Sequence, residues 1–201
     1  LFRSAITVPS GVPFFALLAY FFDGFDAMPA WSSATWLLAG VAGLVHFVFG
    51  RFSNYSATQA LGGTLSSPIQ QLSVLVALIL AILFLNETVS GLNLVGIALV
   101  IVGPATMLRR RTKNAGKRAG SDFEPNFKTG IWWGLLSALG YGTSPLIVAL
   151  AIKSVGSVGS PFGNSIGILF VSYLAASLAV IVMVRSEEHT SELQSPCNLV
   201  C

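Results

Sequence analysis

Two groups of polar residues beside prolines are the side chains of this chain best suited to binding a small molecule in apolar surroundings. The first group consists of Thr64, Ser67, Pro68, Gln70 and Gln71, with Ser66 among them. The second consists of Tyr141 and Thr143, followed by Ser144 and Pro145, with Asn164 further along the chain. Proline frees backbone carbonyls, and a glutamine amide removed from water needs a hydrogen-bond partner. These residue types predict binding through hydrogen bonds.

The alternative for each of these residues is a structural role. The glutamines can bond to neighbouring helices, and small hydroxyl residues in membrane helices often serve close packing. The ring and hydroxyl of Tyr141 can stack on a ligand and orient it, or they can pack in a core or at an interface. The sequence predicts a neutral, zwitterionic or weakly amphipathic ligand, because a phosphate ester would call for buried Lys or Arg.

His46 is the one further candidate, as a proton site. Its unperturbed pKa of about 6.5 suits proton transfer, although a lone histidine near a helix end is also a common structural residue. Both cysteines and the second histidine fall in the last seventeen residues. The chain contains no H-E-x-x-H motif, no paired intramembrane aspartates and no Ser-His pair. The sequence therefore predicts no enzyme, no cofactor and no metal site.

The elements that must position these residues are membrane helices. The chain is 54% hydrophobic and 9% charged, with a mean hydropathy of +0.77. Apolar stretches of about 20 residues, long enough to cross the bilayer, recur along it. The run from Val74 to Leu85 lacks the alternation of a barrel strand. The predicted fold class is an all-α integral membrane protein, a polytopic helical bundle.

Six spans are predicted. They cover residues 5–22, 31–50, 57–85, 89–108, 130–152 and 161–184. The third is too long for one perpendicular crossing, so we expect a break near Pro68. Such a break can line a binding site or be an ordinary proline kink. Gly130 and Gly134 have the spacing that lets membrane helices pack closely.

Charge is distributed unevenly between the two sides of these spans. Threading six spans through the membrane puts nine basic residues on one side: Arg3, Arg51, Arg109, Arg110, Arg111, Lys113, Lys117, Arg118 and Lys128. Only Lys153 falls on the other side, with Asp23, Asp26 and Glu87. Because cytoplasmic loops are enriched in Lys and Arg, the 109–129 linker is predicted to be cytoplasmic. The alternative, a patch that binds nucleic acid or anionic lipid, is less favoured.

Residues 55–103 resemble the end of an EamA-type repeat of the drug/metabolite transporter superfamily. The matching features are Pro68 in a small-residue helix, the helix end at residues 84–87 (Phe-Leu-Asn-Glu) and a final helix that ends at Val102-Gly103. Residues 129–149 are similar to the first helix of a second repeat. Asn86 replaces the usual glycine of the helix end, at a position where either residue suits left-handed geometry.

The resemblance implies a bacterial inner-membrane permease with ten helices in two inverted five-helix repeats. On this interpretation, residues 1–108 are helices 2–5 of the first repeat, and 130–184 are the first two helices of the second. A small-molecule substrate and the lipid bilayer would be its partners, with no nucleic acid; the oligomeric state is left open. A non-transporting structural or sensory membrane subunit is the alternative function.

The last seventeen residues, 185–201, differ abruptly in composition from the rest. Residues 185–195 resemble the translation of a sequencing adapter, which predicts that this tail is an artefact of sequence assembly. The alternative is a genuine cytosolic tail. We also expect the chain to lack natural sequence at both ends, since its first residue is Leu1.

Overall fold

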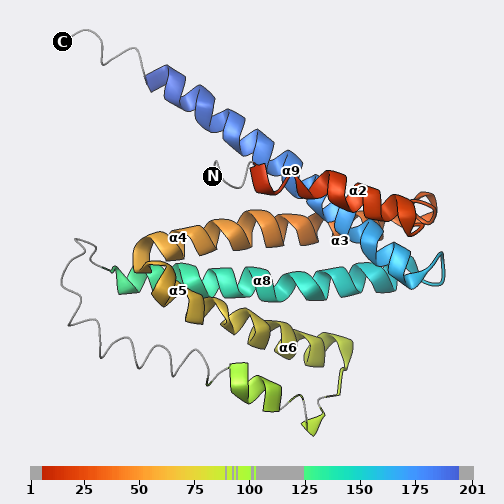
Figure 1. Cartoon of the computed structure of the whole chain (residues 1–201), viewed down its shortest axis with the longest axis horizontal. Coiled ribbons are helices and arrows are strands. Elements are labelled where there is room, and N and C mark those ends of the chain that lie inside the picture. The colour runs from red at the N-terminus through yellow and green to blue at the C-terminus, as the bar shows by residue number, and fades with distance from the viewer. Residues whose placement is uncertain are drawn as a thin grey trace. The chain divides into compact units, whose positions relative to one another are not determined.

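The computed structural model describes residues 6–88, 90–91, 93, 95–100, 102 and 125–194, with backbone only for 186–194. Its elements over these residues are all helices: α2 (Gly11–Phe21), η1 (Met28–Ala30), α3 (Ser33–Gly43), η2 (Leu44–Gly50), α4 (Arg51–Leu61), α5 (Gly63–Gln70), α6 (Leu72–Leu85), α8 (Phe127–Val155) and α9 (Pro161–Gln194) (Figure 1). Among these described residues, four helical segments are long and apolar enough to cross a membrane: Ser33–Leu61, Gly63–Leu85, Phe127–Val155 and Pro161–Arg185. The prediction of an all-α polytopic membrane protein is confirmed.

The largest difference from the predicted spans lies after residue 50. α3, η2 and α4 follow one another without a break and form a single helical segment of 29 residues, Ser33–Leu61. The predicted loop at Arg51 is therefore wrong. The chain turns at Gly62 instead, where φ is +79° and ψ is 153°, a conformation essentially restricted to glycine. The next helix accordingly begins at Gly63 rather than at residue 57.

The predicted break in this next helix is confirmed. α5 contains Pro68 and ends at Gln70, and α6 begins at Leu72, so Gln71 separates them. At the other end of α6, Asn86 adopts a left-handed conformation with φ +53°, as expected for a residue that replaces glycine at a helix end.

The predicted first span, 5–22, is confirmed only in part, since α2 covers eleven residues, Gly11–Phe21, and is not among the four segments long enough to cross a membrane. α2 begins after Pro9, and Pro13 falls in its first turn, where a missing N–H is tolerated. Of the predicted fourth span, the described residues 91, 93, 95–100 and 102 are helical. The linker lies outside the described residues up to 124. α9 begins at Pro161 as predicted and continues to Gln194, into the tail; whether that tail is natural stays a prediction.

Contacts divide the chain into two units. Unit 1 comprises Leu1–Val48 and Ile147–Cys201, and unit 2 comprises Phe49–Leu146. In unit 1, α9 packs against α2 and α3 (Figure 1). Its core is made of small and medium-sized side chains together with one tryptophan: Ala27, Met28, Trp31, Ala39, Ala151, Val155, Ile168 and Val171.

Hydrogen bonds tie the helices of unit 1 to one another. The hydroxyl of Ser172 on α9 donates to the Ala39 carbonyl of α3, at 2.7 Å, and to Ile168 in its own helix, at 2.9 Å. The hydroxyls of Thr35 and Ser154 share a hydrogen bond of 2.7 Å. Buried hydroxyls in membrane helices need such partners, because lipid offers none.

In unit 2, α8 lies between α4 and the α5–α6 pair (Figure 1). Gly140 of α8 meets Gly50 at the start of α4, and Gly130 meets Leu61 at its end, so α4 and α8 run antiparallel. Gly134 packs on Ile69 of α5. The packing role predicted for Gly130 and Gly134 is thus confirmed. Each glycine lets a neighbouring helix approach more closely than a larger residue would allow.

Candidate functional site

α4 is unusually polar for part of a membrane span. Seven of its eleven residues are polar: Arg51, Ser53, Asn54, Tyr55, Ser56, Thr58 and Gln59. Such residues in a spanning segment normally face the protein interior or a water-filled cavity. The observed burial agrees, since Arg51, Asn54 and Tyr55 are partly buried, whereas Phe52 beside them is 43% exposed.

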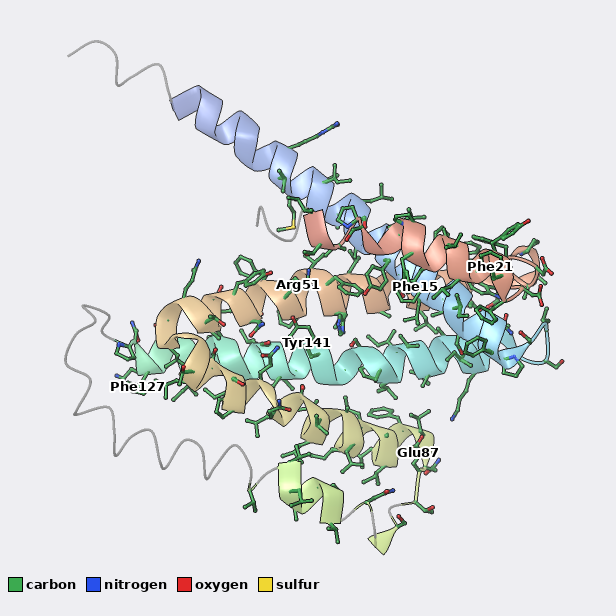
Figure 2. The ribbon with its side chains drawn as sticks, in the orientation of Figure 1. Phe15, Phe21, Arg51, Glu87, Phe127 and Tyr141 are labelled. Atoms are coloured by element: carbon green, nitrogen blue, oxygen red, sulfur yellow. The ribbon has the colours of Figure 1, made fainter. Side chains whose placement is uncertain are left out.

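The inward face of α4 meets Tyr141 on α8. The Tyr141 hydroxyl forms side-chain hydrogen bonds with Arg51 and Asn54, and Tyr55 is close enough to interact with it electrostatically. Figure 2 shows Arg51 on α4 and Tyr141 on the adjacent α8. We call Arg51, Asn54, Tyr55 and Tyr141 the Arg51 cluster. It combines one permanent positive charge with two phenol hydroxyls and one amide.

The Arg51 cluster lies near the middle of both helical segments that build it. The middle of Ser33–Leu61 falls at Phe47, so Arg51 is four residues from it, or about 6 Å along the axis. Tyr141 is the central residue of Phe127–Val155. The hydrocarbon core extends about 15 Å to either side of its midplane. By length alone, the Arg51 cluster therefore falls within the depth of the membrane.

Two buried hydroxyls lie beside the Arg51 cluster, at the contact between α4 and α8. Ser53 and Ser137 are 0% and 1% exposed, and neither Oγ has a hydrogen-bond partner among the described residues. Since Gly50 meets Gly140 and the helices are antiparallel, Ser53 and Ser137 fall at the same level of the interface. These hydroxyls add two further hydrogen-bonding groups to the polar interior of unit 2.

The predicted residues of α5 also belong to unit 2, but they differ in exposure. Thr64, Ser67 and Gln71 are exposed, whereas Pro68 and Gln70 are partly buried. Ser66, which is 4% exposed, shares a hydrogen bond of 3.2 Å with Thr58 of α4 and so closes the turn at Gly62. Of the second predicted group, Tyr141 belongs to the Arg51 cluster and Thr143 is partly buried on the same helix.

The other two predicted residues belong to unit 1, so the structure does not gather all the candidates into one site. The amide of Asn164, in the first turn of α9, donates to the Val158 carbonyl at 2.5 Å and fixes the preceding loop. His46 lies in the π-helical segment η2, with its ring 4.6 Å from that of Phe47. No group of His, Cys, Asp or Glu that could hold a metal occurs among the described residues.

Arg51, Asn54 and Tyr55 were not predicted from the sequence. A charged residue at the end of an apolar stretch usually marks a loop, and Arg51 was interpreted in that way. A signal was nevertheless present. Polar residues at 51, 54, 55 and 58 follow helical spacing, and no glycine or proline interrupts the chain between Arg51 and Gly62.

Comparison with known proteins agrees with this architecture. The sequence profile of the EamA-like transporter family matches residues 2–109, more than half of the 201 residues. No curated protein and no solved structure matches the chain. The match covers α2 to α6 and with them the Arg51 side of the cluster. The chain belongs to the EamA-like transporter family, whose members are membrane transporters rather than enzymes.

Proposed function

We propose that the chain is a permease that moves a small metabolite or drug across the membrane by alternating access, in either direction, and that the Arg51 cluster binds the substrate. The observation that carries this proposal is a charged, hydrogen-bonding cluster at the middle of two membrane helices. Transporters place substrate sites near the midplane, where one part of the protein can move against another.

The position of Arg51 favours transport over a scaffold. An arginine at the centre of a membrane helix costs roughly 2.5–3.5 kcal/mol on insertion scales. A structural or sensory subunit could use apolar packing at the same place without this cost.

The charges support an orientation in a bacterial inner membrane. Asp23, Asp26 and Glu87 are exposed in the turns that follow α2 and α6. The order of the spans places the basic linker 109–129 on the side of the membrane opposite to these acidic residues. Arg51 lies in a helix rather than in a loop, and this correction does not change the order of the spans. We therefore propose that the linker is cytoplasmic.

Accumulation of radiolabelled compounds in bacterial cells tests the proposed function. Cells that express the chain are compared with empty cells for a panel of amino acids, organic acids, amides and cationic drugs. We expect at least one compound to change in accumulation. Tyr141→Phe removes only the hydroxyl that bonds Arg51 and Asn54, and should reduce this change about tenfold, the equivalent of one hydrogen bond to a charged group.

Tyr20→Phe is the matched control, because Tyr20 is 75% exposed on α2, in unit 1. It removes the same atom outside the Arg51 cluster and should leave transport unchanged. If no compound responds to the chain, or if both variants transport like the wild type, the proposed function or its site is wrong. A scaffold with no transport activity would give the first of these results.

A further inference from the structure

We infer that Arg51 binds the carboxylate of a monoanionic or zwitterionic substrate, and that Tyr141 positions the guanidinium for it. This inference rests on the proposed function and deepens it, because it assigns the sign of the charge that the Arg51 cluster selects. It also excludes cationic compounds as substrates.

The first step concerns charge. Arg51 is partly buried, and its guanidinium group carries one positive charge. Its hydrogen-bond partner, the Tyr141 hydroxyl, carries no formal charge, and the sequences of α4, α5, α6 and α8 contain no Asp or Glu. The helices that surround the Arg51 cluster in unit 2 thus supply a positive charge and no negative one. A ligand that enters this cluster gains electrostatic energy if it is an anion and loses it if it is a cation.

The second step concerns geometry. The planar guanidinium group has five N–H donors and can bind a carboxylate through two parallel hydrogen bonds. The Tyr141 hydroxyl, which also bonds Asn54, engages part of this group and thereby restricts its orientation. Tyr55, one helical turn after Arg51, adds an aromatic ring on the same face of α4. An anchored guanidinium beside an aromatic ring suits a small carboxylate with an apolar or zwitterionic body.

The third step separates a carboxylate from a phosphate ester. A phosphate ester carries up to two negative charges and calls for more than one cation. Within unit 2, α8 contributes one basic residue, Lys128, which is exposed. Lys128 lies thirteen residues from Tyr141, about 20 Å along the helix. One cation within reach fits one negative charge. The sequence predicted a neutral, zwitterionic or weakly amphipathic ligand. The inference keeps the zwitterion, adds a monoanion and drops the neutral ligand, because Arg51 lies within a helical segment long enough to span the membrane.

Cysteine labelling measures this selectivity without knowledge of the natural substrate. Tyr55→Cys is introduced into the chain, with Cys197→Ser and Cys201→Ser, and the protein is reconstituted in nanodiscs. Two probes are compared: anionic sulfonatoethyl methanethiosulfonate and cationic trimethylammonioethyl methanethiosulfonate. We expect the ratio of anionic to cationic labelling rates to fall about tenfold in Arg51→Gln, since residues one turn apart are about 6 Å from each other and the two probes respond oppositely. Arg51→Lys should keep most of the ratio.

Two controls separate selectivity from misfolding. Glu87→Cys, exposed in the turn after α6, should show a ratio that does not depend on Arg51. Millimolar benzoate should slow anionic labelling of Tyr55→Cys severalfold with Arg51 present, and not with Arg51→Gln, whereas neutral benzamide should have no effect.

The possible failures are distinguishable. If Tyr55→Cys reacts but its ratio is the same with Arg51 and with Arg51→Gln, the carboxylate inference is overturned and the permease proposal stands. If neither probe reaches Tyr55→Cys from either side while Glu87→Cys reacts, the Arg51 cluster is closed to water. That result overturns the inference and also removes the substrate site of the proposed function.

Discussion

The crossing of α4 and α8 at Gly140 offers a quantitative test of the helix arrangement in unit 2. A Cβ atom added at Gly140 would lie 2.9 Å from the Gly50 Cα, 3.0 Å from Phe49 Cδ1 and 3.2 Å from the Gly50 nitrogen. Two of these three contacts are to backbone atoms, which cannot rotate away. Gly140→Ala therefore forces the two helices apart at the level of the Arg51 cluster.

Two opposing effects set the magnitude. Overpacking a tight contact costs roughly 1–3 kcal/mol. Replacing a helical glycine by alanine gains about 0.5–1 kcal/mol of helix stability. Gly96→Ala is the control, because Gly96 is helical and a Cβ there would have nothing within 4 Å. Gly96→Ala gains only the helix stability. The unfolding free energy of Gly140→Ala should therefore be about 1–3 kcal/mol lower than that of Gly96→Ala.

Unfolding in mixed micelles of dodecyl maltoside and increasing SDS, followed by tryptophan fluorescence, measures this difference. Trp133 is a useful reporter because its ring lies 5.6 Å from that of Phe52, across the same pair of helices. If Gly140→Ala unfolds at the same SDS fraction as Gly96→Ala, α4 and α8 do not cross at Gly50 and Gly140. The reasoning about the Arg51 cluster would then lose its structural basis.

Three further predictions concern other parts of the chain. Gly62→Ala should destabilise the chain by roughly 1–3 kcal/mol in the same SDS titration, because alanine is strained at φ +79° and ψ 153°; an unchanged midpoint would contradict the turn at Gly62. Ser172→Ala should cost about 0.6 kcal/mol in that titration, a typical value for an interhelical hydrogen bond in membranes, and a neutral result would mean that the bond to Ala39 contributes nothing. In intact cells, an impermeant thiol reagent should label Glu87→Cys and spare Lys113→Cys; the reverse pattern would invert the proposed orientation.

The features of the fold that could be predicted were those that depend on local sequence. The order of the described helices, the break after Pro68 and the packing of Gly130 and Gly134 followed from apolar stretches, proline chemistry and small-residue spacing. The end of the second span did not follow. Hydropathy averages over all faces of a helix, so it cannot show that Ser53 of α4 is fully buried while Phe52 beside it is 43% exposed.

The candidate site was predictable only for residues whose type alone indicated a role. Tyr141 was expected because a tyrosine in the middle of a span can bind and orient a ligand. Arg51 and Asn54 depend on the antiparallel register of α4 and α8, which the sequence does not specify. Asn164 resembled a ligand-binding amide, but its hydrogen bond to Val158 is local and structural. Type and spacing thus identify candidates, and tertiary contacts decide which of them meet.

The register of α4 against α8 underlies both proposals, and disulfide cross-linking in native membranes tests it most directly. The pair Ser53→Cys and Ser137→Cys, two buried positions at the same level of the interface, is compared with Ser53→Cys and Leu139→Cys, each with Cys197→Ser and Cys201→Ser. Leu139 is 50% exposed on α8, two residues from Ser137, and so lies on another face of the helix. We predict rapid oxidation of the first pair by copper phenanthroline and little of the second. Equal oxidation of both pairs, or preference for the second, would contradict the Arg51 cluster.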